Sequence, residues 1–552
     1  MKKMYNLLLL CTLFSIGNAQ WTDRIQTNTL VANKDASDIQ TANTNDGRTW
    51  IAFYSNTGSN YDMRAQLLDA NGNRMFGDSG VLVSNAKSGS ATFVFNVCVD
   101  NDNNFVIAFQ VAKGSAYECV MQKVSTSGQL LWGNSGVDLG AGLSPYPATL
   151  STNEIAVAWN GTGVISYQKV SAAGVAAWSP AKTFTGNSGH IVSRAQVVAN
   201  TNGNFSMVYQ DQNFPPFYTN LFEQKFDNSG NKIWTSAVKL TTITTANYRY
   251  YDVHAEKDTT YVGYYGTPSG INRFDAYIQR INGDGSLPWG INGAAFSDFS
   301  AFGDPNEQTI YIAKQEGAND VWAVCTLTNS LQTTSGVYVQ KIDALSGTRY
   351  LGNDAKKLSP LSSRLIQLAF CRLSLCNDEP LFLVTDYSSN KLMAVKLKSD
   401  GSVASFTGIG TSNNVKYRYG FTDVYNGQAV AVWQEDKGSG TMPYAQNINC
   451  DGTTGPKENS LSNNKPSVTL VIKTLYPNPV QSNLSATVTS SVQTNVHIYI
   501  TDVSGNVLKQ TQQNLQKGDN LIQLNAGSIK PGSYFIKVMN GTVSAATMFS
   551  KQ

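Results

Sequence analysis

A short motif recurs along this chain and constrains its architecture more than any other feature. The motif joins a Gln-Lys pair to a turn glycine and, in half of its copies, to a tryptophan, as in residues 122–132 (QKVSTSGQLLW). Its copies recur at spacings of about 46 to 61 residues, and the eight begin at Gln66, Gln122, Gln168, Gln224, Gln279, Gln340, Lys396 and Gln446. This period lies within or slightly above that of propeller repeats, so the sequence predicts an array of equivalent units.

Each motif follows a pattern that predicts a β-hairpin. In one unit, strands are expected at Ala195–Ala199 and Phe205–Gln210, on either side of the turn Asn202-Gly203. Asn-Gly between alternating apolar runs is a strong hairpin signal. The Gln-Lys motif forms a third strand, and a short apolar run after the tryptophan, such as Val137–Leu139, forms a fourth. Four antiparallel strands per unit describe a propeller blade.

The two ends of the repeat array predict that it closes into a ring. The last unit runs into 451–456 without a clear fourth strand, whereas Trp21 and Thr29–Val31 form an isolated tryptophan and fourth strand. Pairing them would cover both sheet edges, which otherwise invite aggregation. The fold class is therefore all-β, with eight blades closed by the N-terminal strand. Seven blades is the alternative, because the seventh copy lacks both Gln and Trp.

The chain divides into four parts. Residues 1–19 are expected to be a signal peptide, because Lys2 and Lys3 precede an apolar run and small residues at 17–19. Residues 20–456 form the propeller, and the polar stretch at 457–473 forms a linker. Residues 474–552 show short alternating strands separated by turns, which predict a small antiparallel β-sandwich. No other run approaches the ~18 apolar residues of a membrane span.

The last domain resembles the type A sorting domain of type IX secretion cargo from Bacteroidota. The resemblance covers about 474–552 and rests on residues whose order and spacing fit the family: Tyr476, Pro477, Asn478, Pro479, Leu484, Asp502, Gly505, Asn506, Gly532, Ser533, Tyr534, Lys551 and Gln552. The family usually has Lys where this chain has Asn506. The resemblance implies passage through the periplasm, recognition by the outer-membrane secretion machinery, and a secreted or cell-surface product.

Six cysteines follow the expected signal peptide: Cys98, Cys119, Cys325, Cys371, Cys376 and Cys450. Export makes disulfides possible, and six cysteines allow 15 connectivities. Cys371 and Cys376 could close a local hairpin, while buried free thiols are the other interpretation. No Cys/His cluster has metal-ligand spacing, so neither a metal site nor a cofactor is expected. A formal charge of +3 gives no indication of a nucleic-acid partner.

Arginines and aromatic residues provide the candidate ligand site. Alignment of the hairpins places Arg194, Arg249 and Arg418 at the same position, at the start of the innermost strand, with Arg364 near the equivalent place. Two of them are flanked by aromatic residues: Tyr248, Tyr250 and Tyr251 around Arg249, and Tyr417, Tyr419 and Phe421 around Arg418. Guanidinium groups beside aromatic rings suit the carboxylate or sulfate groups of a glycan. The alternative is that each arginine pairs with a local carboxylate or backbone carbonyl.

No catalytic residues can be assigned from the sequence. His190, His254 and His497 belong to no Ser/His/Asp arrangement or metal triad. Residues 43–50 only partly resemble a sialidase Asp-box turn. A glycosidase needs two facing carboxylates, and Glu256, Glu307 and Asp423 cannot be ranked from sequence.

Three functions therefore remain. The main hypothesis is a secreted propeller that binds a glycan or a surface protein. The alternatives are an extracellular glycoside hydrolase or sialidase-like enzyme, and a structural adhesin. A pair of carboxylates within ~5–10 Å in the channel would favour the enzyme, and arginines with aromatic residues would favour binding. The recurring Gln and Trp are expected to be structural, with Trp packing between neighbouring blades.

Overall fold

The structure is a computed structural model that describes residues 21, 28–88, 94–213, 218–245, 251–268, 273–299, 305–358, 365–456, 470–503, 506–540 and 543–552. The chain forms two compact units, residues 1–457 and 458–552. The predicted signal peptide at 1–19 lies outside the described residues. Among those residues, no helix is long and apolar enough to cross a membrane.

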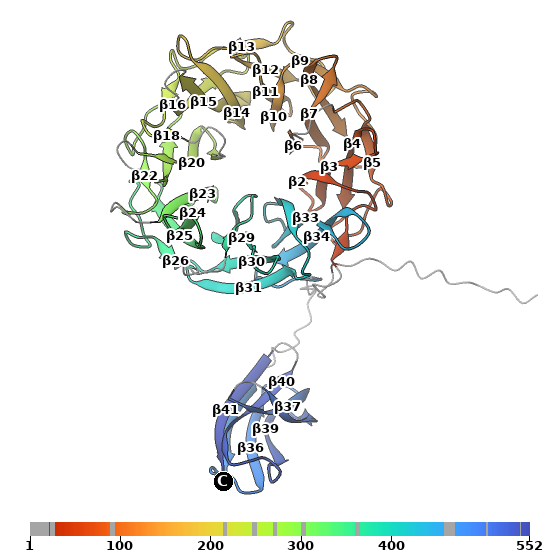
Figure 1. Ribbon diagram of the computed structural model, residues 1–552, viewed down its shortest axis with the longest axis vertical. Coiled ribbons are helices and arrows are strands. Elements are labelled where there is room, and N and C mark those ends of the chain that lie inside the picture. The colour runs from red at the N-terminus through yellow and green to blue at the C-terminus, as the bar shows by residue number, and fades with distance from the viewer. Residues whose placement is uncertain are drawn as a thin grey trace, which may run out of the picture. The chain divides into compact units, whose positions relative to one another are not determined.

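The first unit is a ring of antiparallel sheets, and the described residues form eight of them (Figure 1). Blade 1 contains β2 (Ser37–Asn43), β3 (Thr49–Asn56), β4 (Tyr61–Leu68) and β5 (Val81–Ser84). Blade 2 contains β6 (Phe95–Val99), β7 (Phe105–Lys113), β8 (Ala116–Val124) and β9 (Val137–Ala141). Blade 3 contains β10 (Leu143–Thr149), β11 (Ile155–Asn160), β12 (Ile165–Val170) and β13 (Lys182–Phe184). Blade 4 contains β14 (Ile191–Ala199), β15 (Phe205–Asn213), β16 (Tyr218–Phe226) and β17 (Val238–Lys239).

The second half of the ring repeats this order with two interrupted inner strands. Blade 5 contains β18 (Thr244–Thr245) and β19 (Asp252–Glu256), both paired with β20 (Thr259–Thr267), then β21 (Asp275–Ile281) and β22 (Ala294–Ala295). Blade 6 contains β23 (Asn306–Ala313), β24 (Asp320–Thr328), β25 (Ser335–Asp343) and β26 (Lys356–Lys357). Blade 7 contains β27 (Ile366–Leu368) and β28 (Ser374–Cys376), both paired with β29 (Glu379–Asp386), then β30 (Lys391–Leu397) and β31 (Val403–Gly410). Blade 8 contains β32 (Lys416–Phe421), β33 (Gln428–Asp436) and β34 (Thr441–Asn449).

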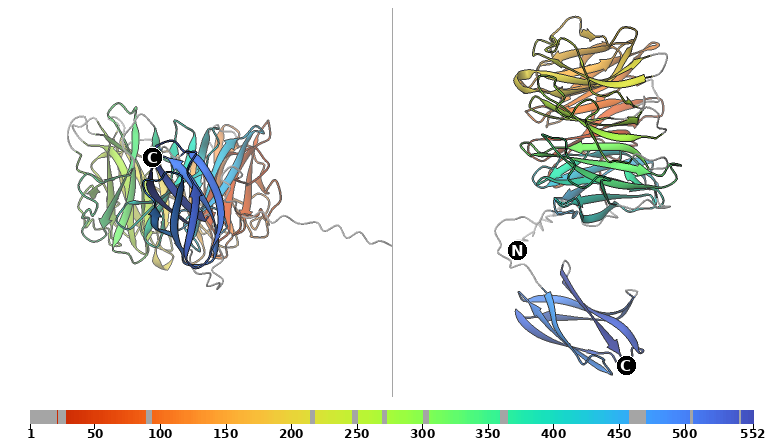
Figure 2. Two further views of the ribbon diagram at one scale, coloured as in Figure 1. Left: turned by 90° about the horizontal axis from the view of Figure 1, so that it is seen from below. Right: turned by 90° about the vertical axis from the view of Figure 1, so that its left-hand side faces the viewer.

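The N-terminal segment completes blade 8, which confirms the predicted eight-bladed closed ring. β1 (Thr29–Leu30) pairs antiparallel with β34, with Thr29 opposite Ala445 and Leu30 opposite Tyr444. The innermost strands surround the central opening of the ring (Figure 1), and the strands run between its two faces (Figure 2). The last sheet therefore keeps no open outer edge at β34.

The recurring tryptophan and glycine form a joint between successive blades, as predicted for the tryptophan. Trp132 of blade 2 lies on the turn of blade 3, where a Cβ added to Gly174 would come within 2.6 Å of the indole ring. The indole N–H of Trp132 donates to the Ala172 carbonyl at 3.1 Å. Gly174 has a φ of +82°, so glycine is required both by its conformation and by the close approach of the ring. Equivalent joints are Trp21–Gly72, Trp178–Gly230, Trp234–Gly285 and Trp289–Gly347.

The recurring glutamine braces blades 1 to 6 from within. In blade 2, Gln122 is 1% exposed and its amide donates to the Gly133 carbonyl at 2.6 Å. In blade 6, Gln340 donates to Gly352 of its own blade at 2.9 Å and to Phe296 of blade 5 at 3.2 Å. These bonds satisfy buried carbonyl groups in the loop between the third and fourth strands. The glutamines are therefore structural, as expected from their repetition.

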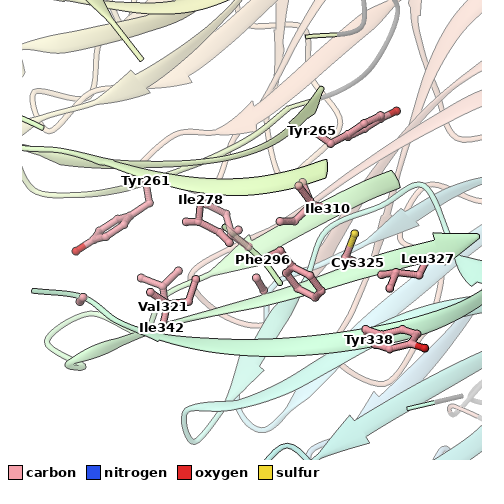
Figure 3. Close-up of a cluster of buried hydrophobic side chains, with 14 residues drawn as sticks. Tyr261, Tyr265, Ile278, Phe296, Ile310, Val321, Cys325, Leu327, Tyr338 and Ile342 are labelled. Atoms are coloured by element: carbon pink, nitrogen blue, oxygen red, sulfur yellow. The ribbon is translucent and has the colours of Figure 1, made fainter. Parts of the chain in front are cut away.

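Apolar residues pack between the faces of adjacent sheets. One cluster joins Tyr261, Tyr265 and Ile278 of blade 5 to Val321 and Leu327 of blade 6, with all five side chains buried (Figure 3). The sheets bury both faces in this way, which explains the nearly continuous apolar runs in the middle strands of the blades.

The disulfide differs from the predicted local hairpin. Cys376 at the end of β28 is bonded to Cys450, which follows β34, over a sequence separation of 74 residues. Cys371 is free, as are Cys98, Cys119 and Cys325. The prediction of a Cys371–Cys376 bridge was therefore wrong, because Cys376 lies against the neighbouring blade. The bond joins blade 7 to blade 8.

The second unit is a small β-sandwich. Its sheets are β35 (Leu470–Tyr476), β36 (Asn483–Ser490) and β39 (Gly518–Asn525), and β38 (Val507–Leu515), β37 (Thr494–Asp502), β40 (Gly532–Asn540) and β41 (Val543–Lys551). The core between them includes Val488 and Ile522 from one sheet and Val496, Ile498 and Ile536 from the other. The first strand begins at Leu470, within the stretch expected to be a linker.

Removing the disulfide is expected to weaken the junction between blades 7 and 8. For a cross-link spanning 74 residues, the loss of chain-entropy restriction corresponds to about 4 kcal/mol. We expect Cys376→Ser/Cys450→Ser to lower the free energy of unfolding by up to this amount, as measured by urea denaturation of the full chain. Cys371→Ser, which removes a free thiol, is the matched control. Equal midpoints for the double variant and the unmodified protein would contradict the structural role of the bond.

Candidate functional site

One face of the ring is marked by bulges in the innermost strands, and we call it the bulge face. The pairing of the first two strands shifts register near the start of β2, β10, β14, β23 and β32. At each shift a non-glycine residue adopts positive φ, between 56° and 64°: Asp38, Ser144, Arg194, Thr309 and Arg418. Non-glycine residues with positive φ are uncommon in strands. A bulge of this kind changes the direction in which the side chain of the bulged residue points. Arg194 and Arg418 thus occupy equivalent positions in blades 4 and 8.

Side chains of the preceding blade hold two of these bulges. The backbone N–H of Arg194 donates to the Asn160 side chain at 2.8 Å. The N–H of Ser144 donates to Gln110 at 3.3 Å. Asn160 and Gln110 both lie in the second strand of the blade before, near its end at the bulge face. A contact between blades therefore helps to fix each of these two bulges.

The aromatic residues predicted to flank Arg418 differ in their exposure to solvent. Tyr417 is 40% exposed, but Tyr419 is 8% exposed and its hydroxyl donates to the Lys416 carbonyl. Tyr419 belongs to the core between blades 7 and 8, so its assignment as a ligand-contacting platform was wrong. Burial raises the pKa of Asp38, while the positive charge of Arg418 acts in the opposite direction. Arg249, Arg364, Tyr248 and Tyr250 lie outside the described residues.

A polar cavity of about 470 Å³ opens on the bulge face between blades 4 and 5. It is formed by the loop that enters blade 4, the adjoining ends of β15 and β16, and the segment that enters blade 5. The lining residues are Asn187, His190, Asp211, Asn213, Asn220, Phe222, Lys239, Thr242, Thr244 and Thr267. Nine of these ten side chains carry a hydrogen-bonding or charged group, and Phe222 is the exception. We call this cavity the blade 4–5 pocket.

His190 and Asp211 form a dyad in the pocket. Asp211 is 3% exposed, and its carboxylate accepts a hydrogen bond from His190 Nδ1. Asn187 donates to the other carboxylate oxygen twice, from its backbone at 3.2 Å and its side chain at 3.1 Å. A Cβ added to Gly186 would lie 2.7 Å from this same oxygen, so glycine allows the loop to close on the carboxylate. Because Nδ1 donates to Asp211, the neutral imidazole presents Nε2 as an acceptor.

The remaining pocket residues offer several types of contact. Phe222 stacks on Tyr209 of the same blade, with ring centroids 6.0 Å apart. The Asn220 amide donates to the Ile243 carbonyl at 3.0 Å, which ties blade 4 to the segment entering blade 5. Lys239 supplies the one cationic group of the lining. The pocket therefore combines an aromatic ring with amide, hydroxyl, imidazole and ammonium groups, a combination suited to a ligand rich in hydroxyl groups.

The other histidines have different surroundings. His254 lies on β19, an innermost strand of blade 5, and burial lowers its pKa. His497 lies in the second unit, stacked on Tyr499. Among the residues that the structure describes, no group of three or more His, Cys, Asp or Glu side chains could hold a metal ion.

The sorting motifs meet at one end of the second unit. The Asn478 side chain accepts the backbone N–H of Ser550 at 2.9 Å, and Val480 forms a parallel bridge with Lys551. The carboxylate of Asp502 accepts both the N–H and the side-chain amide of Asn506, at 2.9 and 2.8 Å. Tyr534 packs against Phe549, with ring centroids 5.9 Å apart. The first and last motifs in sequence therefore form one folded substructure.

A family model identifies this domain. Residues 474–551 match the secretion system C-terminal sorting domain, which confirms the resemblance drawn from Tyr476, Pro477, Asn478 and Pro479 and the later motifs. The chain is therefore cargo of type IX secretion, directed to the cell surface or the extracellular space.

The similarity to solved structures is found at low sequence identity. The polysaccharide lyase Uly1 is 9% identical, covering 78% of this chain and 100% of its own, with a TM-score of 0.43. The Dos1 propeller is 10% identical over 77% of this chain and 94% of its own, also with a TM-score of 0.43. An α-L-arabinanase from Penicillium chrysogenum, solved with arabinobiose, is 10% identical over 77% and 98%, with a TM-score of 0.36. A search of the curated proteins finds no match.

Sequence reasoning missed the blade 4–5 pocket. The sequence places His190 in no recognisable catalytic arrangement, and Asp211 lies 21 residues away on the second strand. The sequence does hold one signal for Asp211, which is its position in the second strand of the blade. Other blades also carry a polar side chain near the end of this strand, as at Gln110 and Asn160. Only the pairing of β14 with β15, which places Val192 opposite Asp211, brings the two groups together.

Deleting Leu470–Gln552 is expected to leave the protein in the periplasm, since these residues form all the strands of the sorting domain. The measurement is cell fractionation with an antibody to the ring. The full chain carrying Arg418→Ala should still reach the surface or the medium. Export of the truncated ring at the level of the full chain would contradict the sorting role.

Proposed function

We propose that this protein is a secreted or cell-surface propeller that binds an extracellular glycan on its bulge face. The observation that carries the proposal is the blade 4–5 pocket. Its lining is rich in side chains that donate or accept hydrogen bonds, and it includes one aromatic ring. Sugars present many hydroxyl groups around a ring with an apolar face, so they match both features. A lipid or an apolar peptide would leave these polar groups unsatisfied, at a cost in free energy.

The dyad gives the pocket a defined recognition group. Asp211 fixes the orientation of the His190 ring, so that Nε2 can accept a hydrogen bond from a sugar hydroxyl without prior rearrangement. Lys239 can donate to a hydroxyl or pair with an acidic substituent. The phenyl ring of Phe222 is already held by Tyr209 and can support the apolar face of a sugar ring.

Arg194 and Arg418 extend the proposal to the rest of the bulge face. Both are placed by the inner-strand bulges, and a guanidinium group binds carboxylate or sulfate in a two-pronged geometry. We propose that they contact acidic substituents of the same glycan. Arg249, Tyr248, Tyr250 and the exposed Tyr417 complete the predicted set.

Variants of the pocket test this function. On a glycan array, the full chain is expected to bind a defined set of oligosaccharides, and His190→Ala and Lys239→Ala should each weaken that binding about tenfold or more. Each variant removes one hydrogen bond to the sugar, and in Lys239→Ala the lost donor is charged. Such a bond contributes about 1–3 kcal/mol to the free energy of binding.

Lys398→Ala removes an exposed lysine of blade 7 and is the matched control for the loss of a surface charge. Arg418→Ala should weaken binding only to acidic glycans. The proposal fails if the full chain binds no glycan, or if both pocket variants bind as the unmodified protein does.

A further inference from the structure

The blade 4–5 pocket holds groups that can remove a proton from a bound sugar as well as groups that can bind it. Its lining includes the imidazole of His190, the ammonium of Lys239 and the carboxylate of Asp211. Hydrolysis of a glycosidic bond uses two carboxyl groups, and Asp211 is the one carboxylate among the described lining residues. Both of its oxygens already accept hydrogen bonds, from His190 and Asn187. The described lining therefore favours chemistry that begins with an imidazole base.

His190 is positioned to act as that base. Asp211 lies against Nδ1 and an ionised carboxylate can only accept, so the ring proton is on Nδ1 and Nε2 keeps its lone pair. The side chain of His190 is 27% exposed, while Asp211 is buried behind it. A buried carboxylate on Nδ1 holds the ring in one orientation and stabilises the imidazolium that forms when Nε2 takes a proton.

The pairing of the strands places Lys239 on the other side of Phe222 from this dyad. In blade 4, Asp211 of β15 is opposite Asn220 of β16, and Phe222, two residues further along β16, is opposite Lys239 of β17. Paired residues, like residues two apart on one strand, lie on the same face of a sheet. Since neighbouring strands are about 4.8 Å apart, β15 and β17 are separated by about 10 Å. An aromatic ring therefore lies between the imidazole base and the ammonium group.

A base and a cation on either side of a sugar site suit one reaction of acidic polysaccharides. In a uronate, the hydrogen on C5 is next to the carboxylate, and its removal moves negative charge onto the carboxylate oxygens. An imidazole can take this proton, and a positioned ammonium group stabilises the charge that develops. A neutral sugar has no carboxylate at C6, so its C5 hydrogen is not acidic. The two groups together therefore select a uronate.

We propose that the blade 4–5 pocket cleaves uronate-containing polysaccharides by β-elimination, with His190 as the catalytic base and Lys239 bound to the uronate carboxylate. Nε2 of His190 takes the proton from C5, and the electron pair of that C–H bond forms a double bond between C4 and C5. The bond from C4 to the glycosidic oxygen breaks, and the oxygen keeps the bonding pair. The imidazolium returns its proton to this oxygen. The products are a saccharide with a new reducing end and one that ends in an unsaturated uronate, and no water is consumed.

The other lining residues support this reaction. The sugar ring can rest on Phe222, which lies between the base and the cation. Asn220 uses one of its two amide N–H groups on the Ile243 carbonyl, so the other can donate to the sugar. Asp211 acts through His190 and is a positioning residue. The inference rests on the proposed glycan ligand, which it narrows to a uronate polymer, and it adds a reaction at the same pocket.

The test uses the full chain with polygalacturonate, alginate and chondroitin sulfate, all of which contain uronates. It follows the ultraviolet absorbance of the unsaturated uronate, which hydrolysis does not produce, and in parallel measures new reducing ends. Absorbance should rise with at least one of these polymers. Linear arabinan, which contains no uronate, is the substrate control and should give no increase.

Three variants assign the reaction to the pocket. His190→Gln should lower kcat/KM about 100-fold or more, because general acid–base catalysis contributes about 10²–10⁴. It should still bind the polymer, because glutamine can donate to Asp211 and offer its oxygen to a sugar hydroxyl. Lys239→Gln should lower kcat/KM about tenfold or more, because it removes the charge that stabilises the transition state. Lys398→Gln, the matched control on an exposed lysine of blade 7, should leave kcat/KM unchanged.

The outcomes distinguish this inference from the proposed binding. Glycan binding without an absorbance increase from any uronate polymer overturns the inference and leaves the binding function intact. New reducing ends without the absorbance would show hydrolysis and would also overturn it. Elimination that His190→Gln retains at full kcat/KM contradicts the assignment of the base. If the full chain neither binds nor cleaves any glycan, the proposed function fails together with the inference.

Discussion

The contact between an aromatic ring and the turn glycine of the next blade is the interaction on which the ring depends. It occurs where Trp132 meets Gly174 and recurs around the ring, and Phe76 takes the place of tryptophan against Gly128. Each joint buries apolar surface, and the indole N–H usually bonds a carbonyl of the facing turn. Trp21 makes this same joint with blade 1, so the N-terminal segment closes the ring by the interaction that builds it.

Between blades 6 and 7, Leu351 takes the place of the aromatic ring against Gly401, and at the junction of blades 7 and 8 no large side chain fills this place. There, Ser405 stands against Gly452 in place of an aromatic side chain. The disulfide from Cys376 ends at Cys450, two residues before that glycine. At the Trp132 joint the equivalent position is Ala172, the acceptor of the indole N–H. A covalent bond thus replaces the missing ring contact at the corresponding place.

Much of the ring could be predicted, because its determinants repeat within each unit. Gln122 and Trp132 form contacts that recur from blade to blade, so the spacing of these residue types predicts the architecture. The innermost strand of blade 7 is interrupted between β27 and β28, and no repeated residue in the sequence marks this interruption. β38 is also hard to predict, because Val507–Leu515 is an edge strand whose side chains are mostly exposed and do not alternate. Cys376 and Cys450 meet only through the packing of two blades.

Hydrogen–deuterium exchange can show whether Trp21 closes the eight-bladed ring. Exchange is compared between the full chain and Trp21→Ala, with Trp132→Ala as the matched joint inside the ring. We expect Trp21→Ala to speed exchange in β33 and β34 of blade 8 and in β3 and β4 of blade 1, on both sides of the closure. Trp132→Ala should instead affect blades 2 and 3. Faster exchange confined to the N-terminal segment, with blades 1 and 8 unchanged, would contradict closure by this joint.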